Sequence, residues 1–193
     1  MSPHVVIYDF CSAEMSFGNP QNYNSFLYIF VGTFLGGGLV LNNQLVNGKT
    51  GNAGAIGSLP FYNGSTQSQL ITQSSLYLLE RKLNDAGHNG QHIYESPSHW
   101  SCDTRSIEDW LSETARGLAF ATQCAMSLLD LDGVIIDGAI PDDVKNALVA
   151  HTQTAMETLD MRGLAQVHIS EGLVGRKAQS IGSANLALQA NYY

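Results

Sequence analysis

The expected fold is decided by the stretch Phe26-Leu27-Tyr28-Ile29-Phe30-Val31-Gly32-Thr33-Phe34-Leu35-Gly36-Gly37-Gly38-Leu39-Val40-Leu41. Its first half is an unbroken aromatic and β-branched run, typical of a strand buried on both faces. The three glycines predict a turn, because consecutive glycines adopt positive φ without a steric penalty. Residues 39–41 then form a second strand, and Asn42-Asn43 turns the chain into a third at residues 44–46. The pattern predicts an antiparallel meander.

Outside the meander, hydrophobic spacing predicts helices that alternate with strands. Residues 5–8 suggest a short strand and residues 11–17 a helix that ends at Gly18. Beyond residue 46 the expected helices cover residues 66–86, 106–133, 141–163 and 174–190, and the expected strands cover residues 134–136 and 167–169. The order from the meander onward is βββ-αα-β-α-β-α, which predicts an α/β fold with a mixed sheet and helices on its faces.

Within these elements, particular residues are expected to set the ends and the buried faces. Leu76, Leu79 and Leu83 follow one face of the first long helix, which Gly87 ends. Residues 87–105 are expected to form a loop, and Ser106 is expected to cap the next helix.

Composition and charge limit the classes of function. Of 193 residues, 9 are Lys or Arg and 17 are Asp or Glu, for a net charge of -8 without a basic run. This balance argues against direct contact with nucleic acid or an anionic membrane, and the chain carries no signal peptide or membrane span, so a cytoplasmic protein is expected. Only 13% of residues are charged, which suits either a surface covered by a second copy, as in a homo-oligomer, or a surface rich in neutral polar residues.

Three cysteines and two glycine-rich stretches are the remaining candidates for chemistry. Cys11, Cys102 and Cys124 are far apart and form no CxxC pair, so they predict reduced thiols and no metal site. Residues 32–38 could form a concave array of N–H donors for a phosphate, and the alternative is a tight turn with a glycine bulge. The small residues of 48–58 indicate a backbone packed closely against another part of the chain or a ligand.

Taken together, three separated motifs resemble the ROK family (repressors, open reading frames and kinases). They are GTFLGGGLVLNNQLVNGKTGNAGAIGSLP, VIIDGAIPDD and GLVGRKAQSIGSANLAL. The resemblance implies the C-terminal lobe of an actin-like ATPase (ribonuclease H-like) sugar kinase over residues 26–193, with residues 1–25 as a remnant of the inter-lobe region. No Asp-x-Gly-Gly-Thr-like segment and no basic helix-turn-helix occur, so this chain is expected to lack the N-terminal lobe and a DNA-binding segment.

The same resemblance implies a set of site residues. ATP is the implied cofactor and a small-molecule sugar the implied partner. The residues that would bind ATP are Gly32, Thr33, Gly36, Gly37 and Gly138, and those that would face the sugar are Asn52, Ala55 and Ser58.

Several positions depart from the family pattern. Ala55 stands where the family has a glutamate that contacts sugar hydroxyls, Ser58 stands where it has a zinc-binding histidine, and the cysteine-rich zinc motif is missing. The family's catalytic aspartate aligns with Val6. Asp9 could replace it only if the local alignment shifts, and otherwise Asp9 is an ordinary aspartate near the start of a helix.

Three functions follow from this pattern of matches and departures. The first is the sugar-sensing effector domain of a ROK-family transcriptional regulator, degenerate as a kinase. The loss of the catalytic and zinc-binding residues favours this interpretation. The second is an active ATP-dependent sugar kinase for a hexose or amino sugar. The third is a non-catalytic oligomerisation module, motivated by the low charge fraction.

Overall fold

A five-stranded mixed sheet forms the centre of the protein in the computed structural model, which describes residues 3–19, 21–64, 66–95, 99–100 and 103–175. The strand order is β3-β2-β1-β6-β7, where β1 is antiparallel to β2 and parallel to β6, and β6 is parallel to β7. The strands are β1 (Phe26–Val31), β2 (Leu35–Leu41), β3 (Gln44–Leu45), β6 (Gly133–Gly138) and β7 (His168–Glu171). The α/β class and the mixed sheet expected from the sequence are confirmed.

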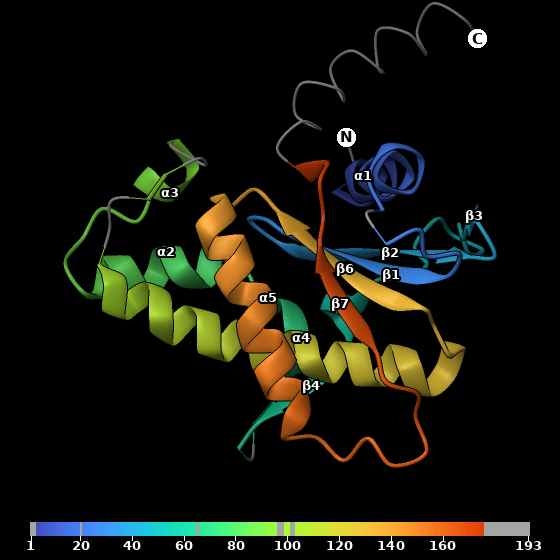
Figure 1. Ribbon diagram of the computed structural model, residues 1–193. Coiled ribbons are helices and arrows are strands. Elements are labelled where there is room, and N and C mark those ends of the chain that lie inside the picture. The colour runs from blue at the N-terminus through green and yellow to red at the C-terminus, as the bar shows by residue number, and fades with distance from the viewer. Residues whose placement is uncertain (1–2, 20, 65, 96–98, 101–102, 176–193) are drawn as a thin grey trace, which may run out of the picture.

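Helices cover the sheet on both faces, but unequally (Figure 1). Among the helices of the described residues, α4, α5 and α2 lie across one face, and α1 alone lies on the other. The helices are α1 (Pro3–Phe17), α2 (Leu76–Asp85), α3 (His92–Glu95), α4 (Thr104–Leu129) and α5 (Asp142–Glu157). A separate hairpin of β4 (Pro60–Asn63) and β5 (Thr66–Gln69), with the short turns η1 (Ile56–Ser58) and η2 (Leu70–Thr72), connects β3 to α2.

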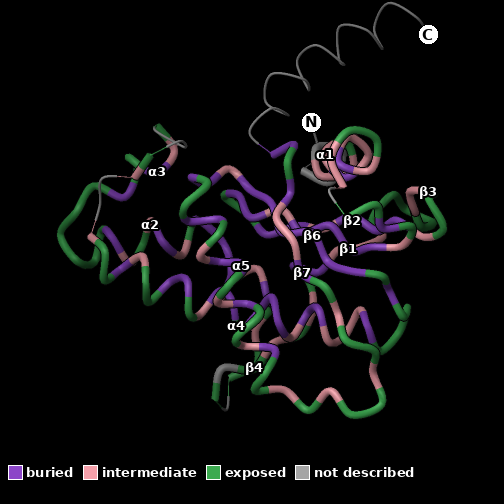
Figure 2. The backbone as a smooth tube through the Cα atoms, in the orientation of Figure 1, coloured by how far each residue is buried: buried purple, intermediate pink, exposed green. Residues whose placement is uncertain are grey.

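The central strand β1 is buried on both faces, as its sequence predicts (Figure 2). Leu27, Ile29 and Val31 belong to the large core beneath α4 and α5. Phe26 and Tyr28 alternate with them and belong to a smaller core on the side of α1. Since successive side chains of a strand point to opposite faces, the continuous apolar run supplies both cores at once.

The glycine triplet does not form the predicted turn. Gly36, Gly37 and Gly38 lie inside β2, paired with Phe30, Ile29 and Tyr28, and none of the three has a positive φ. The turn between the strands is instead the short bend at residues 32–34. The Asn42-Asn43 turn is confirmed, with φ of 51° and 60°.

What these glycines provide is space rather than backbone freedom. A Cβ at Gly38 would lie 2.6 Å from Cys11 Cβ and 2.7 Å from Cys11 Sγ, and a Cβ at Gly36 would collide with Ile7 Cδ1. On the opposite face, a Cβ at Gly37 would lie 2.5 Å from the carbonyl oxygen of Gly54. A larger residue at any of the three positions would push α1 or the 51–58 loop away from β2.

The strand expected at residues 5–8 is wrong, because these residues belong to α1. Their β-branched composition favours a strand locally, but Ile7, Cys11 and Glu14 follow helical spacing and contact other elements from one side of the helix. Packing of this face against β2 and its surroundings overrides the local preference.

Further differences concern the ends of elements after the meander. The helix expected over residues 66–86 starts only at Leu76, because residues 66–72 form β5 and η2. Its buried leucines and its end at Gly87, which has a φ of 84°, are as predicted. Asp103 rather than Ser106 caps α4, since its carboxylate accepts the Ser106 N–H at 2.8 Å. Residues 87–105, expected as a loop, include α3 and the first residues of α4. The helix expected over 174–190 lies almost entirely outside the described residues.

Two fully buried carboxylates, Glu14 of α1 and Asp137 of β6, bind the backbone that follows β7. Glu14 accepts hydrogen bonds from the N–H groups of Leu173 and Val174 at 3.0–3.1 Å. Asp137 accepts the N–H of Gly175 at 2.6 Å. Each carboxylate lies on a different element, so together they join α1 and the sheet to the same four-residue segment.

Further bonds to this carboxylate cluster come from the N–H groups of Asn19 and Gly138 and from two side chains. Asp137 accepts the Tyr28 hydroxyl at 3.1 Å and the Lys145 ammonium at 3.3 Å, and Lys145 also donates to the Gly172 carbonyl at 2.7 Å. Lys145 thus pairs with the buried Asp137. Burial raises the pKa of Glu14, and the charge of Asp137 adds to the rise, against the lowering effect of the backbone N–H donors.

Substitution of Gly38 by Ala tests the close contact between α1 and β2. We expect Gly38→Ala to lower the free energy of unfolding by about 1–3 kcal/mol, the usual effect of overpacking, because the clash involves the Cβ of Cys11, which cannot rotate away. Gly36→Ala is the matched control and should cost less, since only the end of the Ile7 side chain must move. Urea unfolding measures both, and equal or negligible losses would contradict the contact.

The pH dependence of stability tests the buried state of Glu14. Below the ordinary glutamate pKa of 4.5 the carboxyl is protonated in the folded and the unfolded chain, so its stabilising contribution is fully present. It is lost as the pH rises through the higher pKa of the folded state. Relative to Glu14→Gln, the parent protein should therefore lose stability between pH 4.5 and neutrality in urea unfolding. Glu157→Gln, at an exposed glutamate, supplies the baseline, and a parent protein that gains stability relative to Glu14→Gln as the pH rises would refute the assignment.

Candidate ligand pocket

A pocket of about 270 Å³ lies beside the glycine strand. Gly36, Gly37 and Gly38 form part of its wall, and the 51–58 loop contributes Asn52, Ala55 and Ser58. The structure thus brings all three residues predicted to face a sugar together with two of those predicted to bind ATP. The strand β3 pairs only with the end of β2, at Val40 and Leu41, so the edge of β2 beside the glycines is covered by this loop rather than by another strand.

Glycines position the 51–58 loop directly on β2. Gly54 has a φ of 81°, and a Cβ there would lie 3.0 Å from the backbone of Gly38. A Cβ at Gly57 would lie 2.5 Å from the Leu35 carbonyl oxygen. The close backbone packing predicted for this stretch is confirmed, and the strand β2 is what it packs against.

Two pairs of pocket residues come from segments that the sequence did not connect with the site. Ile7 and Tyr8 enter from α1, and Gln69 and Ile71 enter from the end of β5 and from η2. Ile7 and Tyr8 were missed because residues 5–8 were expected to form a strand, and Gln69 and Ile71 because residues 66–86 were expected to be one helix. The helical spacing of Ile7, Cys11 and Glu14 is a signal that could have placed the first pair.

Gly32 and Gly138, both predicted to bind ATP, lie outside this pocket. The Gly32 N–H donates to the Phe34 carbonyl at 3.1 Å, and the Gly138 N–H donates to the Asp137 carboxylate at 2.8 Å. Both donors are therefore already occupied within the chain. The Cα of Gly138 faces the carbonyl oxygen of Val31 so closely that no side chain fits there.

Thr33 lies in a separate shallow pocket with two carboxylates. Its neighbours there include Glu80, Tyr94 and Glu95. The Tyr94 hydroxyl donates to Glu80 at 3.2 Å, and burial together with the charge of Glu80 raises the pKa of Tyr94 to about 12. Carboxylates repel phosphate, so Glu80 and Glu95 disfavour an unpaired phosphate beside Thr33. That Gly32, Thr33 and Gly138 bind ATP stays a prediction.

Asp9, the weak candidate for a catalytic base, is exposed on α1 and does not line the pocket. Partial burial raises its pKa. The described lining includes no Asp, Glu, His, Lys or Arg, and Tyr8 is its only ionisable side chain. The pocket can therefore bind a ligand by hydrogen bonds and apolar contact, but it holds no carboxylate that could accept a proton from a hydroxyl.

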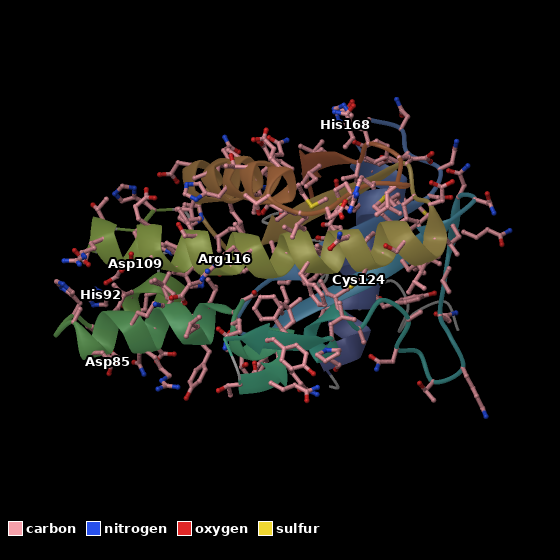
Figure 3. All side chains as sticks on the ribbon, turned by 90° about the horizontal axis from the view of Figure 1, so that it is seen from below. Asp85, His92, Asp109, Arg116, Cys124 and His168 are labelled. Carbon is pink, nitrogen blue, oxygen red and sulfur yellow. The ribbon has the colours of Figure 1, made fainter. Side chains whose placement is uncertain are left out.

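His88, His92 and His99, which lie within 12 residues of one another in the sequence, are exposed. Figure 3 shows His92 and Asp85 at one end of the helical layer, away from His168 of β7. Within the described ranges, no group of three or more His, Cys, Asp or Glu side chains is arranged to hold a metal ion. In the same part of the chain, no helix combines the length and the apolar character needed to cross a bilayer.

Comparison with known proteins identifies the family pattern and the fold. Residues 7–69 match the model of the ROK family. A search of curated proteins gives no match. Among solved structures, a ROK family glucokinase from Streptomyces griseus in complex with glucose and AMPPNP is similar with a TM-score of 0.73 at 22% identity, over 95% of this chain and 67% of that one.

Other similar structures include both enzymes and a regulator. A ROK hexokinase from Thermus thermophilus has a TM-score of 0.67 at 20% identity, over 96% of this chain and 65% of that one. A ROK family transcriptional regulator, a homologue of the E. coli MLC protein, has a TM-score of 0.71 at 19% identity, over 89% of this chain and 48% of that one. This chain thus spans about half to two thirds of the length of these structures.

The resemblance predicted from the sequence motifs is confirmed: residues 7–69 carry the ROK family pattern, and the chain has the mixed α/β, actin-like ATPase fold of ROK sugar kinases.

Proposed function

We propose that this chain is the sugar-sensing effector domain of a ROK-family transcriptional regulator and binds a small-molecule sugar without phosphorylating it. The observation that carries the proposal is the pocket beside β2, where Asn52 and Ser58 offer hydrogen bonds while no carboxylate lines the described wall. Binding a sugar needs neutral donors and acceptors, whereas phosphorylating one also needs a group that orients and deprotonates a hydroxyl. The described wall of this pocket supplies neutral donors and acceptors but no group that deprotonates a hydroxyl.

Similarity to solved structures supports the proposal but does not choose between its alternatives. The similar structures include a glucokinase bound to glucose and AMPPNP and also a transcriptional regulator. The choice of a regulator follows from Ala55 and Ser58, which are uncharged side chains at the pocket wall, and from Asp9, which lies outside it. In this proposal residues 26–193 form the sensing lobe and residues 1–25 are a remnant of the inter-lobe region.

The kinase alternative is tested by nucleotide turnover and sugar binding on the same chain. We expect a coupled ATPase assay with hexoses and amino sugars to show no sugar-dependent turnover, because no proton acceptor lines the pocket. Calorimetry should nevertheless detect sugar binding, which Asn52→Ala weakens about fivefold through loss of a hydrogen bond of about 1 kcal/mol. Asn47→Ala, at a nearby exposed asparagine outside the pocket, is the matched control. Turnover would establish the kinase, and absence of all sugar binding would exclude both functions.

Self-association is the second part of the proposal. Only 13% of residues are charged, and the described surface includes large exposed apolar side chains such as Phe17 (78%) and Leu128 (82%). Cores of protein interfaces are depleted of charged residues, so the low charge fraction supports contact between copies. We expect light scattering to give a mass at least twice that of the 20.8 kDa chain, and a monomer across the micromolar range would contradict this part alone.

A further inference from the structure

The side chains that line the pocket beside β2 are more apolar than a plain sugar requires. Ile7, Val46 and Ile71 come from three different parts of the chain and line the same space together with Ala55. These apolar side chains are half-buried, so they form the wall rather than the outer surface.

Polar side chains are confined to the mouth of the pocket. Asn52, Ser58 and Gln69 line it and are exposed, and Tyr8 is half-buried. All four are neutral hydrogen-bonding groups. The pocket therefore has a polar rim that can bind hydroxyl groups and an apolar wall that cannot.

This division decides which ligands fit. A hexose buried against Ile7 and Val46 would leave hydroxyl groups without partners, which is costly in an apolar environment. A phosphate or carboxylate would be worse, because the described lining contains no Lys, Arg or His to pair with it. A sugar ring held at the rim, with an apolar substituent directed to the wall, satisfies both parts of the pocket.

We infer that the pocket binds a neutral monosaccharide carrying a small apolar substituent, such as an alkyl or aryl glycoside, in preference to the free hexose or its phosphate. The inference rests on the proposed sugar-binding function and narrows its ligand class. The pocket volume of about 270 Å³ suits a ligand of this size. Pockets for drug-sized ligands start at roughly 300 Å³, so this pocket is limited to a single sugar with a small group.

Matched sets of ligands test this inference on the 193-residue chain by calorimetry. Glucose, mannose and galactose are each compared as the free sugar, the phenyl glycoside and the 6-phosphate. For at least one of the three, the phenyl glycoside should bind about tenfold more tightly than the free sugar, which corresponds to burial of roughly 55 Å² of apolar surface. The 6-phosphate should bind more weakly than the free sugar. Phenol alone should bind no more tightly than the free sugar.

A pair of valine variants locates the apolar contact. Val46→Thr places a hydroxyl in the wall with little change in shape and should reduce the advantage of the phenyl glycoside severalfold. Val167→Thr makes the same change at another half-buried valine outside the pocket and should leave that advantage intact. An equal effect of the two variants would overturn the assignment to this wall.

The outcomes separate this inference from the function on which it rests. A free hexose that binds as tightly as its phenyl glycoside, or a 6-phosphate that binds more tightly, leaves sugar sensing in place and overturns the inference. Phenol that binds as tightly as the phenyl glycoside also overturns the inference, because the sugar is then not recognised. Failure of all nine sugars to bind removes the proposed function together with the inference.

Discussion

Close approach of helix α1 to strand β2 is the constraint on which the rest of the structure depends. Contact is achieved only because β2 has no side chains at three consecutive positions, so Ile7 and Cys11 can lie where Cβ atoms of the strand would be. Proteins are packed too densely to absorb an added methyl group here without moving the helix. The same glycines leave room on the opposite face for the carbonyl of Gly54. One strand thus positions both sides of the ligand pocket.

The buried carboxylates extend this constraint across the molecule. Glu14 lies on the same helix as the pocket residues Ile7 and Tyr8, yet its oxygens bind the backbone N–H groups of Leu173 and Val174. Buried carboxylates are stable when several donors satisfy them, and here the donors come from a segment far along the chain. Helix α1 is therefore fastened at one end to the segment after β7 and forms the pocket wall at the other.

Chemistry at the pocket follows from what its side chains can and cannot do. Neutral groups at the rim can bind hydroxyls, and an apolar wall can bury a small substituent, but the described lining provides no carboxylate near the ligand. Two of the five residues predicted to bind ATP are engaged within the chain, since the N–H donors of Gly32 and Gly138 bind Phe34 and Asp137. The proposed recognition of a sugar rests on the neutral groups of this described lining.

Local sequence determined the central strands, the helices α4 and α5, the family pattern and the closeness of the 51–58 loop to another backbone, because these depend on periodicity and on glycine. Sequence reasoning also grouped Asn52, Ala55 and Ser58 correctly, since they share one loop. Only the tertiary structure decided that residues 5–8 are helical, that the glycine triplet is a strand, and that Tyr8 and Gln69 join the pocket. In each case the deciding energy comes from packing between elements far apart in the chain, which overrides a local preference of less than about 1 kcal/mol per residue.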